Sequence, residues 1–277
     1  MKKRITFIAL CFIAIAVTAQ TAHIEVCYVA HHPNLTDGKT DLTNKYILLA
    51  NITESKFYSP ITEYIDSLSS TPEGKTKLTE ISRAALNADN LDGIPKPDGT
   101  IYVIKSFANN KLTYYDTAGL EKFTYEELIT PWKWEICDST NVILGYECIM
   151  AITDYHGRKW TAWFAPEIPV QNGPWKLDGL PGLILKAQAE GGQYSFIATG
   201  IQQTTKPISP VYLANDYEHI TRINYLKAKR SFIDNPLGKI NAQYGNAGGT
   251  ISTNDGDDLK DLYVPASVAD FLETDYH

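Results

Sequence analysis

The chain has 277 residues, 44% of them hydrophobic and 21% charged, with a formal net charge of −7. This length allows a substantial buried core, in one large domain or two small ones. The apolar content and the 17 tyrosines exclude general disorder, and the acidic balance argues against binding to nucleic acid or to anionic lipid surfaces.

The first 19 residues have the pattern of a secretory signal peptide. Met1–Arg4 is basic, Ile5–Val17 is apolar, and Thr18-Ala19 supplies small residues at the cleavage position. A transmembrane anchor is the alternative, but the run is short and has no basic stop-transfer flank. Cys11 lies inside this run without a lipid-attachment box around it. We therefore expect residues 20–277 to be exported to the periplasm or the extracellular space, without a transmembrane segment.

The next part of the chain alternates apolar runs with turn-rich loops. Residues 23–30 and 44–52 are rich in Val, Ile, Leu and Tyr, which predicts two strands. Thr71-Pro72-Glu73 combines an N-cap residue, a proline for the first helical position and an acid for the first turn. With the apolar stripe that follows, it predicts a helix over 71–90, ended by "DGIPKPDG" at 92–99.

Residues 100–202 change to a strand pattern. Short Tyr-, Ile- and Val-rich runs are separated by turn residues such as Asn109-Asn110. Tyr194, Phe196 and Ala198 alternate with polar neighbours, which is typical of a strand with one buried face. The pattern predicts an antiparallel meander.

One stretch interrupts this meander. Prolines 166, 169, 174 and 181 cannot donate in a central ladder, so we expect residues 165–181 to be an ordered crossing between strands. The glycines at 179 and 182 allow backbone geometry or close approach that a Cβ would forbid. We expect Pro181→Ala and Gly182→Val to damage folding.

The last part of the chain has one predicted helix. Residues 215–233 are amphipathic and end before Asn235-Pro236. The acidic run "NDGDDLKD" at 254–261 lacks EF-hand spacing and is interpreted as a solvated loop. Without an internal repeat or linker, residues 20–277 are expected to form a single β-rich domain. The predicted class is α+β, predominantly antiparallel β: a curved sheet or open half-barrel with two helices packed on it, similar to periplasmic lipoprotein-carrier proteins.

Three cysteines remain after the leader: Cys27, Cys137 and Cys148. In an oxidising compartment two of them are expected to pair. Cys137 and Cys148 are the first candidates because they lie on two runs that we interpret as neighbouring strands, and such a loop would contribute about 3 kcal/mol. Pairing of Cys27 with either one, or three buried free thiols, are the alternatives. No cysteine-protease signature surrounds any of them.

All five tryptophans, at positions 132, 134, 160, 163 and 175, fall within a short part of the chain. Such a cluster forms either one end of a core or the wall of an apolar pocket. If it forms a pocket, the candidate binding residues are Trp160, Trp163, Trp175, Arg158 and Asp178.

Signals for catalysis or metal binding are weak. His31-His32, His156 and His219 show no metal-binding spacing, and no nucleophile elbow occurs. Glu167 and Asp178 are the acids nearest the tryptophans, and each is typical of a capping or turn residue. We expect no metal and no cofactor, and name no catalytic residue.

The central motif carries a resemblance. "GLPGLI", residues 179–184, resembles the signature of the GLPGLI family, secreted proteins of Bacteroidetes without an established activity. "SKFYS" at 55–59, "ILGYECIMA" at 143–151 and the block at 157–185 also resemble that family. The resemblance implies an exported, β-rich protein, with no catalytic residues to carry over. Its structural motif residues are Gly179, Leu180, Pro181, Gly182, Leu183 and Ile184.

Three functional hypotheses follow. The first is a non-enzymatic binding or carrier module for an apolar small molecule, a peptide or an envelope protein. The second is a structural or assembly protein of the cell envelope. The third is a hydrolase with an acid-based site near Glu167, Asp178 and Arg158.

Overall fold

The structure, a computed structural model, describes residues 21–35, 41–236, 238–239 and 271–276. The expected signal peptide at 1–19 and the acidic run at 254–261 lie outside the described residues.

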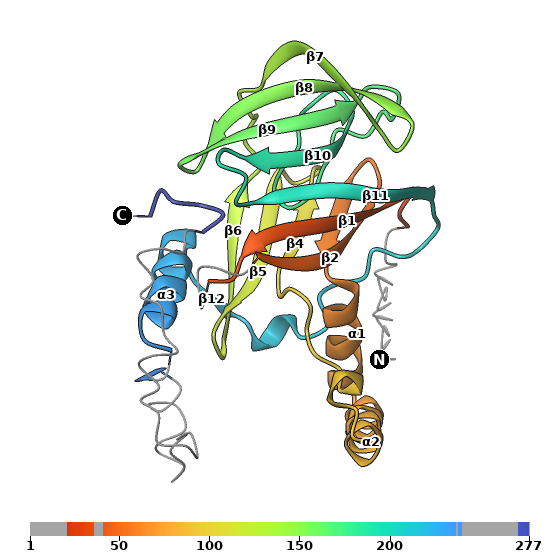
Figure 1. The fold of residues 1–277 in the computed structure, drawn as a ribbon, viewed down its shortest axis with the longest axis vertical. Helices are drawn as coiled ribbons and strands as arrows, with labels where there is room; N and C mark the ends of the chain where they lie inside the picture. The colour runs from red at the N-terminus through yellow and green to blue at the C-terminus, as the bar shows by residue number, and fades with distance from the viewer. Residues whose placement is uncertain (1–20, 36–40, 237, 240–270, 277) are drawn as a thin grey trace, which may run out of the picture.

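The described strands form one 12-stranded sheet in the order β12-β6-β5-β4-β3-β2-β1-β11-β10-β9-β8-β7. Neighbours pair antiparallel, except that the short β12 pairs parallel with β6. The two end strands, β12 and β7, are not joined, so the strongly curved sheet stays open (Figure 1). This confirms the predicted class. The strands are β1 (Ile24–Pro33), β2 (Asp41–Ala50), β3 (Glu54–Tyr58), β4 (Tyr102–Ser106), β5 (Lys111–Ala118), β6 (Glu121–Leu128), β7 (Glu135–Ile143), β8 (Tyr146–Tyr155), β9 (Arg158–Ala165), β10 (Leu183–Ala189), β11 (Ser195–Gln203) and β12 (Glu218–His219).

Three α-helices are present in the described chain: α1 (Pro60–Ser69), α2 (Pro72–Asn87) and α3 (Arg222–Asp234). Thr71 caps α2 as expected, because its side chain accepts from the Gly74 N–H. The sequence interpretation missed α1, although Ser59-Pro60 is the same start signal: the Ser59 side chain accepts from the Thr62 N–H. The described chain therefore has three α-helices where the sequence predicted two. Helix α1 packs against α2 (Figure 1).

The last helix is shorter than the predicted 215–233. Residues Ala214–Asp216 form a 3-10 turn and Glu218–His219 form β12, so α3 begins only after its N-cap Thr221. The backbone of β12 pairs with β6, a long-range contact that overrides the local helical pattern. Helix α3 packs against β5 and β6. Within the described residues, none of the helices combines the length and apolar character needed to cross a bilayer.

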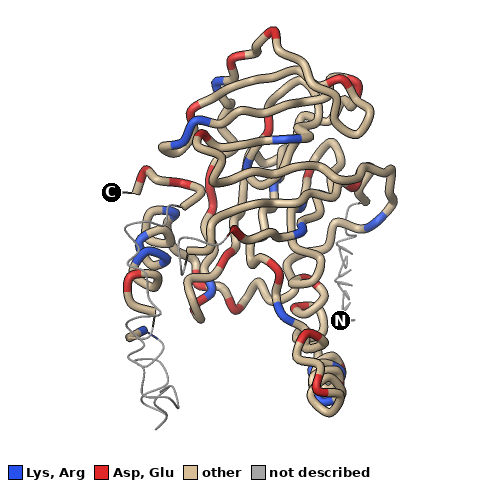
Figure 2. Tube along the Cα trace, viewed as in Figure 1, with Lys and Arg blue, Asp and Glu red and all other residues tan. Residues whose placement is uncertain are grey.

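Two hydrophobic clusters lie on opposite faces of the sheet. The larger contains Val103, Phe164 and Leu183, and the smaller contains Tyr102 and Ile208. Val103 and Tyr102 are neighbours on β4, so their side chains point to opposite faces. The larger cluster is the main core. Charged residues of both signs are spread along the described trace (Figure 2).

Between β9 and β10 the chain crosses the main core as residues 166–182, here called the crossing segment. Its Trp175, Leu177 and Leu180 are at most 1% exposed. Lys105 of β4, also 1% exposed, donates from Nζ to the Leu177 carbonyl at 2.8 Å and lies 3.2 Å from the Asp178 carboxylate. The expected ordered crossing is thus packed into the core and held by a buried ion pair.

The three cysteines are free thiols in the structure. The expected Cys137–Cys148 bond is not formed, because in the β7–β8 register Cys148 lies opposite Asn141. The pairing is irregular between Ile136 and Thr140, which moves Cys137 out of line with Cys148. Burial raises the pKa of the Cys27 and Cys148 thiols, so neither is an activated nucleophile.

Candidate ligand-binding site

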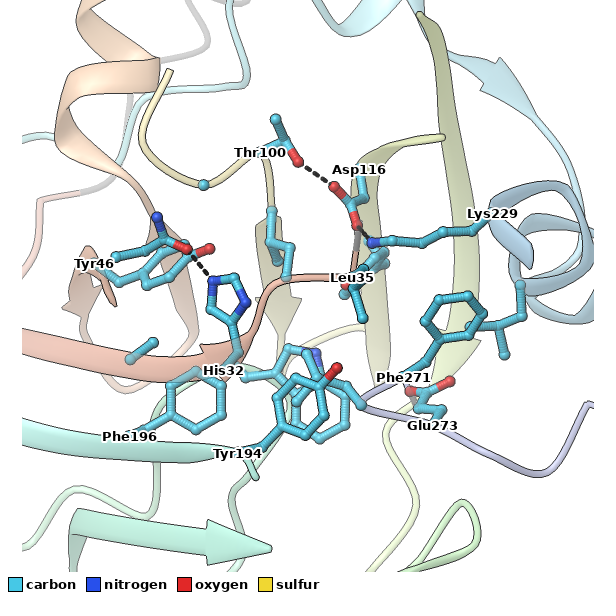
Figure 3. Close-up of a pocket in the computed structure, with 18 of the residues that line it drawn as sticks. His32, Leu35, Tyr46, Thr100, Asp116, Tyr194, Phe196, Lys229, Phe271 and Glu273 are labelled. Carbon is cyan, nitrogen blue, oxygen red and sulfur yellow. Dashed lines mark hydrogen bonds and ion pairs between the residues drawn. The ribbon is translucent and has the colours of Figure 1, made fainter. Parts of the chain in front are cut away.

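A cavity of about 140 Å³ lies between the sheet, α3 and residues 271–276, here called the C-terminal segment. Strands β1, β2, β5, β6 and β11 supply one side, and α3 with the C-terminal segment supplies the other (Figure 3). Its lining includes Ala30, His32, Leu35, Asn44, Tyr46, Thr100, Tyr114, Asp116, Tyr125, Trp175, Tyr194, Phe196, Tyr225, Leu226, Lys229, Phe271 and Glu273.

Eight of the 21 lining residues are tyrosine, phenylalanine or tryptophan. Tyr114 of β5 stacks on Tyr125 of β6 with 4.9 Å between ring centroids. Tyr225 of α3 lies 5.7 and 5.6 Å from these two rings. Trp175 is 1% exposed, and its Nε1 has no hydrogen-bond acceptor among the described residues. The packed rings make the cavity rigid and apolar.

Asp116, one of the buried carboxylates in this wall, accepts hydrogen bonds from several donors. Asp116 is 0% exposed; it accepts from the Lys229 ammonium at 2.6 Å and from the hydroxyls of Thr100 and Tyr225 (Figure 3). Burial alone would raise the pKa of Asp116, but Lys229 and the hydroxyl donors outweigh it and lower the pKa. Burial, reinforced by Asp116, raises the pKa of Tyr225 well above its usual value. Asp116 and Lys229 therefore form a buried ion pair to which the hydroxyls of Thr100 and Tyr225 also donate.

On the opposite side of the cavity, His32 is fixed by polar partners. Its Nε2 faces the Asn44 Oδ1, and its Nδ1 lies 3.0 Å from the Pro33 carbonyl. The Asn44 Nδ2 donates to Asp98, which sets the orientation of the amide. Tyr194 stacks on the His32 ring at 6.4 Å (Figure 3). His31, the residue before His32, instead contacts Thr43. The two histidines have different partners because adjacent side chains of a strand point to opposite faces.

The C-terminal segment forms part of the cavity wall. Phe271, Leu272 and Glu273 line it directly. The Arg158 Nε donates to the Phe271 carbonyl at 2.6 Å, and the Thr274 N–H donates to the His156 carbonyl at 2.8 Å. The segment is therefore bound to β9 and to the β8–β9 turn.

Charged side chains strengthen this docking. Glu273 lies 2.5 Å from Lys176 and 2.9 Å from Arg222. Asp275 contacts Arg222 at 2.7 Å and the His156 Nδ1 at 2.7 Å. Glu127, His156 and Glu273 stand close enough together to suggest metal ligands. However, the Lys176 ammonium lies 2.5 Å from both carboxylates, so a side-chain cation already holds that position.

Acid is expected to release the C-terminal segment. Burial would raise the pKa of Asp275, but hydrogen bonds from Arg222 and His156 lower it to about 2. A carboxyl whose pKa is lowered on docking stabilises the docked state above its ordinary pKa, and this contribution is lost as the pH falls toward 2. The amide signals of Thr274 and Tyr276 should shift between about pH 4 and 2 in ¹H–¹⁵N spectra. Asp275→Asn should reduce this change, and signals from β5 should report any global unfolding separately.

The structure separates the candidate residues that the sequence grouped together. Trp160 is fully buried 5.6 Å from Trp175, and only Trp175 lines the cavity. Trp163 is half-buried beneath the Lys186 ammonium. Arg158 holds the C-terminal segment and lies over the Tyr194 ring at 4.9 Å. Asp178 pairs with Lys105 and lies outside this cavity.

The three residues of the hypothetical acid-based site lie in different surroundings. Glu167 is exposed, Asp178 is buried against Lys105, and Arg158 contacts a backbone carbonyl. The sequence interpretation missed Asp116, Lys229, Tyr194 and the C-terminal segment. The many tyrosines were the one available signal, because five of them line the cavity: Tyr46, Tyr114, Tyr125, Tyr194 and Tyr225.

The geometry defines an open antiparallel sheet with a small aromatic-walled cavity under α3 and the C-terminal segment. Residues 154–186 match a family described as "Protein of unknown function (Porph_ging)". This stretch contains the β8–β9 turn, β9 and the crossing segment. No curated protein matches the chain.

Two solved structures of PNGF-II are similar to the chain. In the C2 and P21 crystal forms the identity is 15% and 17%, the TM-score is 0.48 in both, and the match covers 76% of this chain. The chain spans 33% of PNGF-II. MucB in complex with MucA(peri) has 10% identity and a TM-score of 0.32, covering 70% of this chain and 54% of MucB. At these values the likeness carries no inference about function.

Proposed function

We propose that the protein is an exported, non-enzymatic binding module that holds a ring-sized apolar group in the cavity beneath α3. The observation that carries the proposal is the aromatic wall of this cavity, to which the C-terminal segment contributes Phe271. Its volume of about 140 Å³ is close to that of a buried apolar cavity in another protein, about 150 Å³, that takes up benzene. Export rests on the N-terminal leader pattern, and the GLPGLI resemblance supports the same setting.

The charges around the cavity favour a neutral guest. Asp116 is paired with Lys229, and Glu273 is paired with Lys176 and Arg222. A charged group entering this space would lose its hydration without gaining an unpaired partner. The apolar group is therefore the part of the ligand that the cavity selects.

The test is direct binding of a neutral ring. 4-Fluorotoluene should bind with a Kd on the order of a millimolar or tighter, measured by ¹⁹F NMR. Ala30→Ile should abolish this binding, because Ala30 is 4% exposed and lines the cavity. The larger side chain would occupy the space at an overpacking cost of about 1–3 kcal/mol, which urea unfolding would measure.

The matched control is the same substitution at Ala84, an exposed position on α2. Ala84→Ile should bind the probe as the parent does. Equal binding by the parent and a folded Ala30→Ile variant would refute the cavity as the site. Native mass spectrometry of residues 20–277 after gentle purification would then identify any natural guest that accompanies the protein.

A further inference from the structure

A second cavity, of about 650 Å³, shares no lining residue with the first. It lies among the β4–β5 turn, residues 129–132 and the crossing segment, next to the ends of β1 and β2. Its volume falls within the range of small-ligand and peptide pockets, about 300–1,000 Å³.

One wall of this cavity contains a buried amide donor without a partner. Asn172 is 1% exposed and lines the cavity. Its Oδ1 accepts from the Lys105 Nζ at 3.1 Å and from the Gly173 N–H at 2.8 Å. These two donors fix which side of the amide is oxygen, so the Nδ2 must point away from them. No acceptor for this Nδ2 exists among the described residues, and buried donors are normally satisfied.

Two further amides stand at the same cavity. Gln171, beside Asn172, and Asn110, at the β4–β5 turn, both line it and are exposed. Neither side chain has a hydrogen-bond partner within the part of the chain that the structure describes. Asn51 differs, since its amide oxygen already accepts from Thr53. A side-chain amide offers one acceptor and two donors, the same kinds of group that a peptide unit needs.

The remaining lining is mostly apolar, and its other polar side chains are those of His23, Thr130 and Asp178. Ile24, Ile52 and Ile129 face the cavity, and Ile52 is 85% exposed. Asp178, the only acid among the described lining residues, is held by Lys105 at 3.2 Å. The site therefore matches a neutral ligand with backbone-like polar groups on one side and apolar side chains on the other.

We infer that this second cavity binds a neutral, extended peptide segment of a partner protein. The exposed amides of Asn110 and Gln171 bond to its backbone, the buried Asn172 amide lies in the wall beside Gln171, and Ile52 packs against its apolar side chains. A saccharide fits less well, because it requires an open aromatic face. Trp132 is the tryptophan of this wall, and it already stacks on Trp134 at 5.4 Å and on Tyr155 at 3.8 Å.

The probe is the capped, uncharged peptide acetyl-Ser-Val-Ser-Leu-Ser-amide, added to residues 20–277 and followed by ¹H–¹⁵N NMR. Binding should be saturable and should shift the side-chain amide signals of Asn172. Gln171→Ala and Asn110→Gly should each weaken binding by about 2- to 12-fold, the effect of one neutral hydrogen bond. Glycine is chosen at position 110 because Asn110 has φ of 53°, which alanine would strain.

Three controls decide the outcome. Gln193→Ala removes an exposed amide elsewhere and should leave the affinity unchanged, as should Ala30→Ile at the first cavity. A peptide with N-methylated backbone amides should lose binding if the main chain is recognised. The inference is overturned if the probe does not saturate, if N-methylation has no effect, or if cellotriose binds instead with the same dependence on Gln171.

Discussion

Gly182→Val is expected to prevent stable folding. Gly182 has φ of +154°, and a Cβ at this position would lie 2.3 Å from the Ala165 carbonyl oxygen and 2.7 Å from its carbon. Both atoms belong to the backbone of Ala165, the last residue of β9. Ala165 pairs with Leu183, the first residue of β10. Because a ladder cannot shift locally, we expect a loss of at least about 4 kcal/mol, a large fraction of a typical stability. Urea unfolding and secreted yield would measure it.

The matched comparison uses alanine at two glycines with positive φ. Gly182→Ala meets the same backbone clash, whereas Gly191 has φ of +79° and no atom within 4 Å of the place that a Cβ would take. Gly191→Ala should therefore cost only the conformational strain, about 1–2 kcal/mol. Equal stability of the two variants would show that close approach is not the reason for Gly182. Pro181 is exposed, so the damage that the sequence led us to expect from Pro181→Ala should be small.

The strand pattern was predictable because alternation is a local signal. Tyr194, Phe196 and Ala198 are 5%, 4% and 3% exposed, as their alternation with polar residues indicates. The crossing segment was predictable for a different reason, since four prolines cannot all sit in a central ladder. Both conclusions use only neighbours in the sequence.

The candidate site could not be predicted in the same way. Asp116 and Lys229 are 113 positions apart, and Glu273 reaches Lys176 across the curve of the sheet. Such pairs depend on how the open sheet bends and on where α3 docks, which no local pattern specifies. The missed α1 is a different error. Its Ser59-Pro60 start signal was present in the sequence but was not interpreted as the start of a helix.

The crossing segment links these parts of the molecule. Trp175 forms part of the first cavity, and Gln171 and Asn172 form part of the second. Lys176, which follows Trp175, lies 2.5 Å from Glu273 of the C-terminal segment. One rigid connection therefore positions the walls of both proposed binding sites, so its ion-pair anchors are expected to matter for stability before they matter for binding.

The anchor with the largest expected effect is Asp178, which is 4% exposed and paired with the fully buried Lys105. Burial lowers the pKa of Lys105, and Asp178 opposes this shift. Asp178→Asn would leave the ammonium buried without a counter-charge, and losing one partner of such a pair costs about 3–5 kcal/mol. Lys105→Met should cost a similar amount. It would leave the Asp178 carboxylate without its cation, and the Asn172 Oδ1 and the Leu177 carbonyl without this donor.

Urea unfolding of both single variants and the double variant tests this expectation. The double variant should be more stable than the sum of the single losses predicts, since it buries no lone charge. Glu167→Gln changes an exposed acid of the same segment and should stay within about 0.5 kcal/mol of the parent. The hydrolase hypothesis predicts a different result for Asp178→Asn: the variant would keep its full stability and lose a measurable turnover. An Asp178→Asn variant that unfolds like the parent would show that the ion pair does not anchor the crossing segment, and would return Asp178 to the candidates for chemistry.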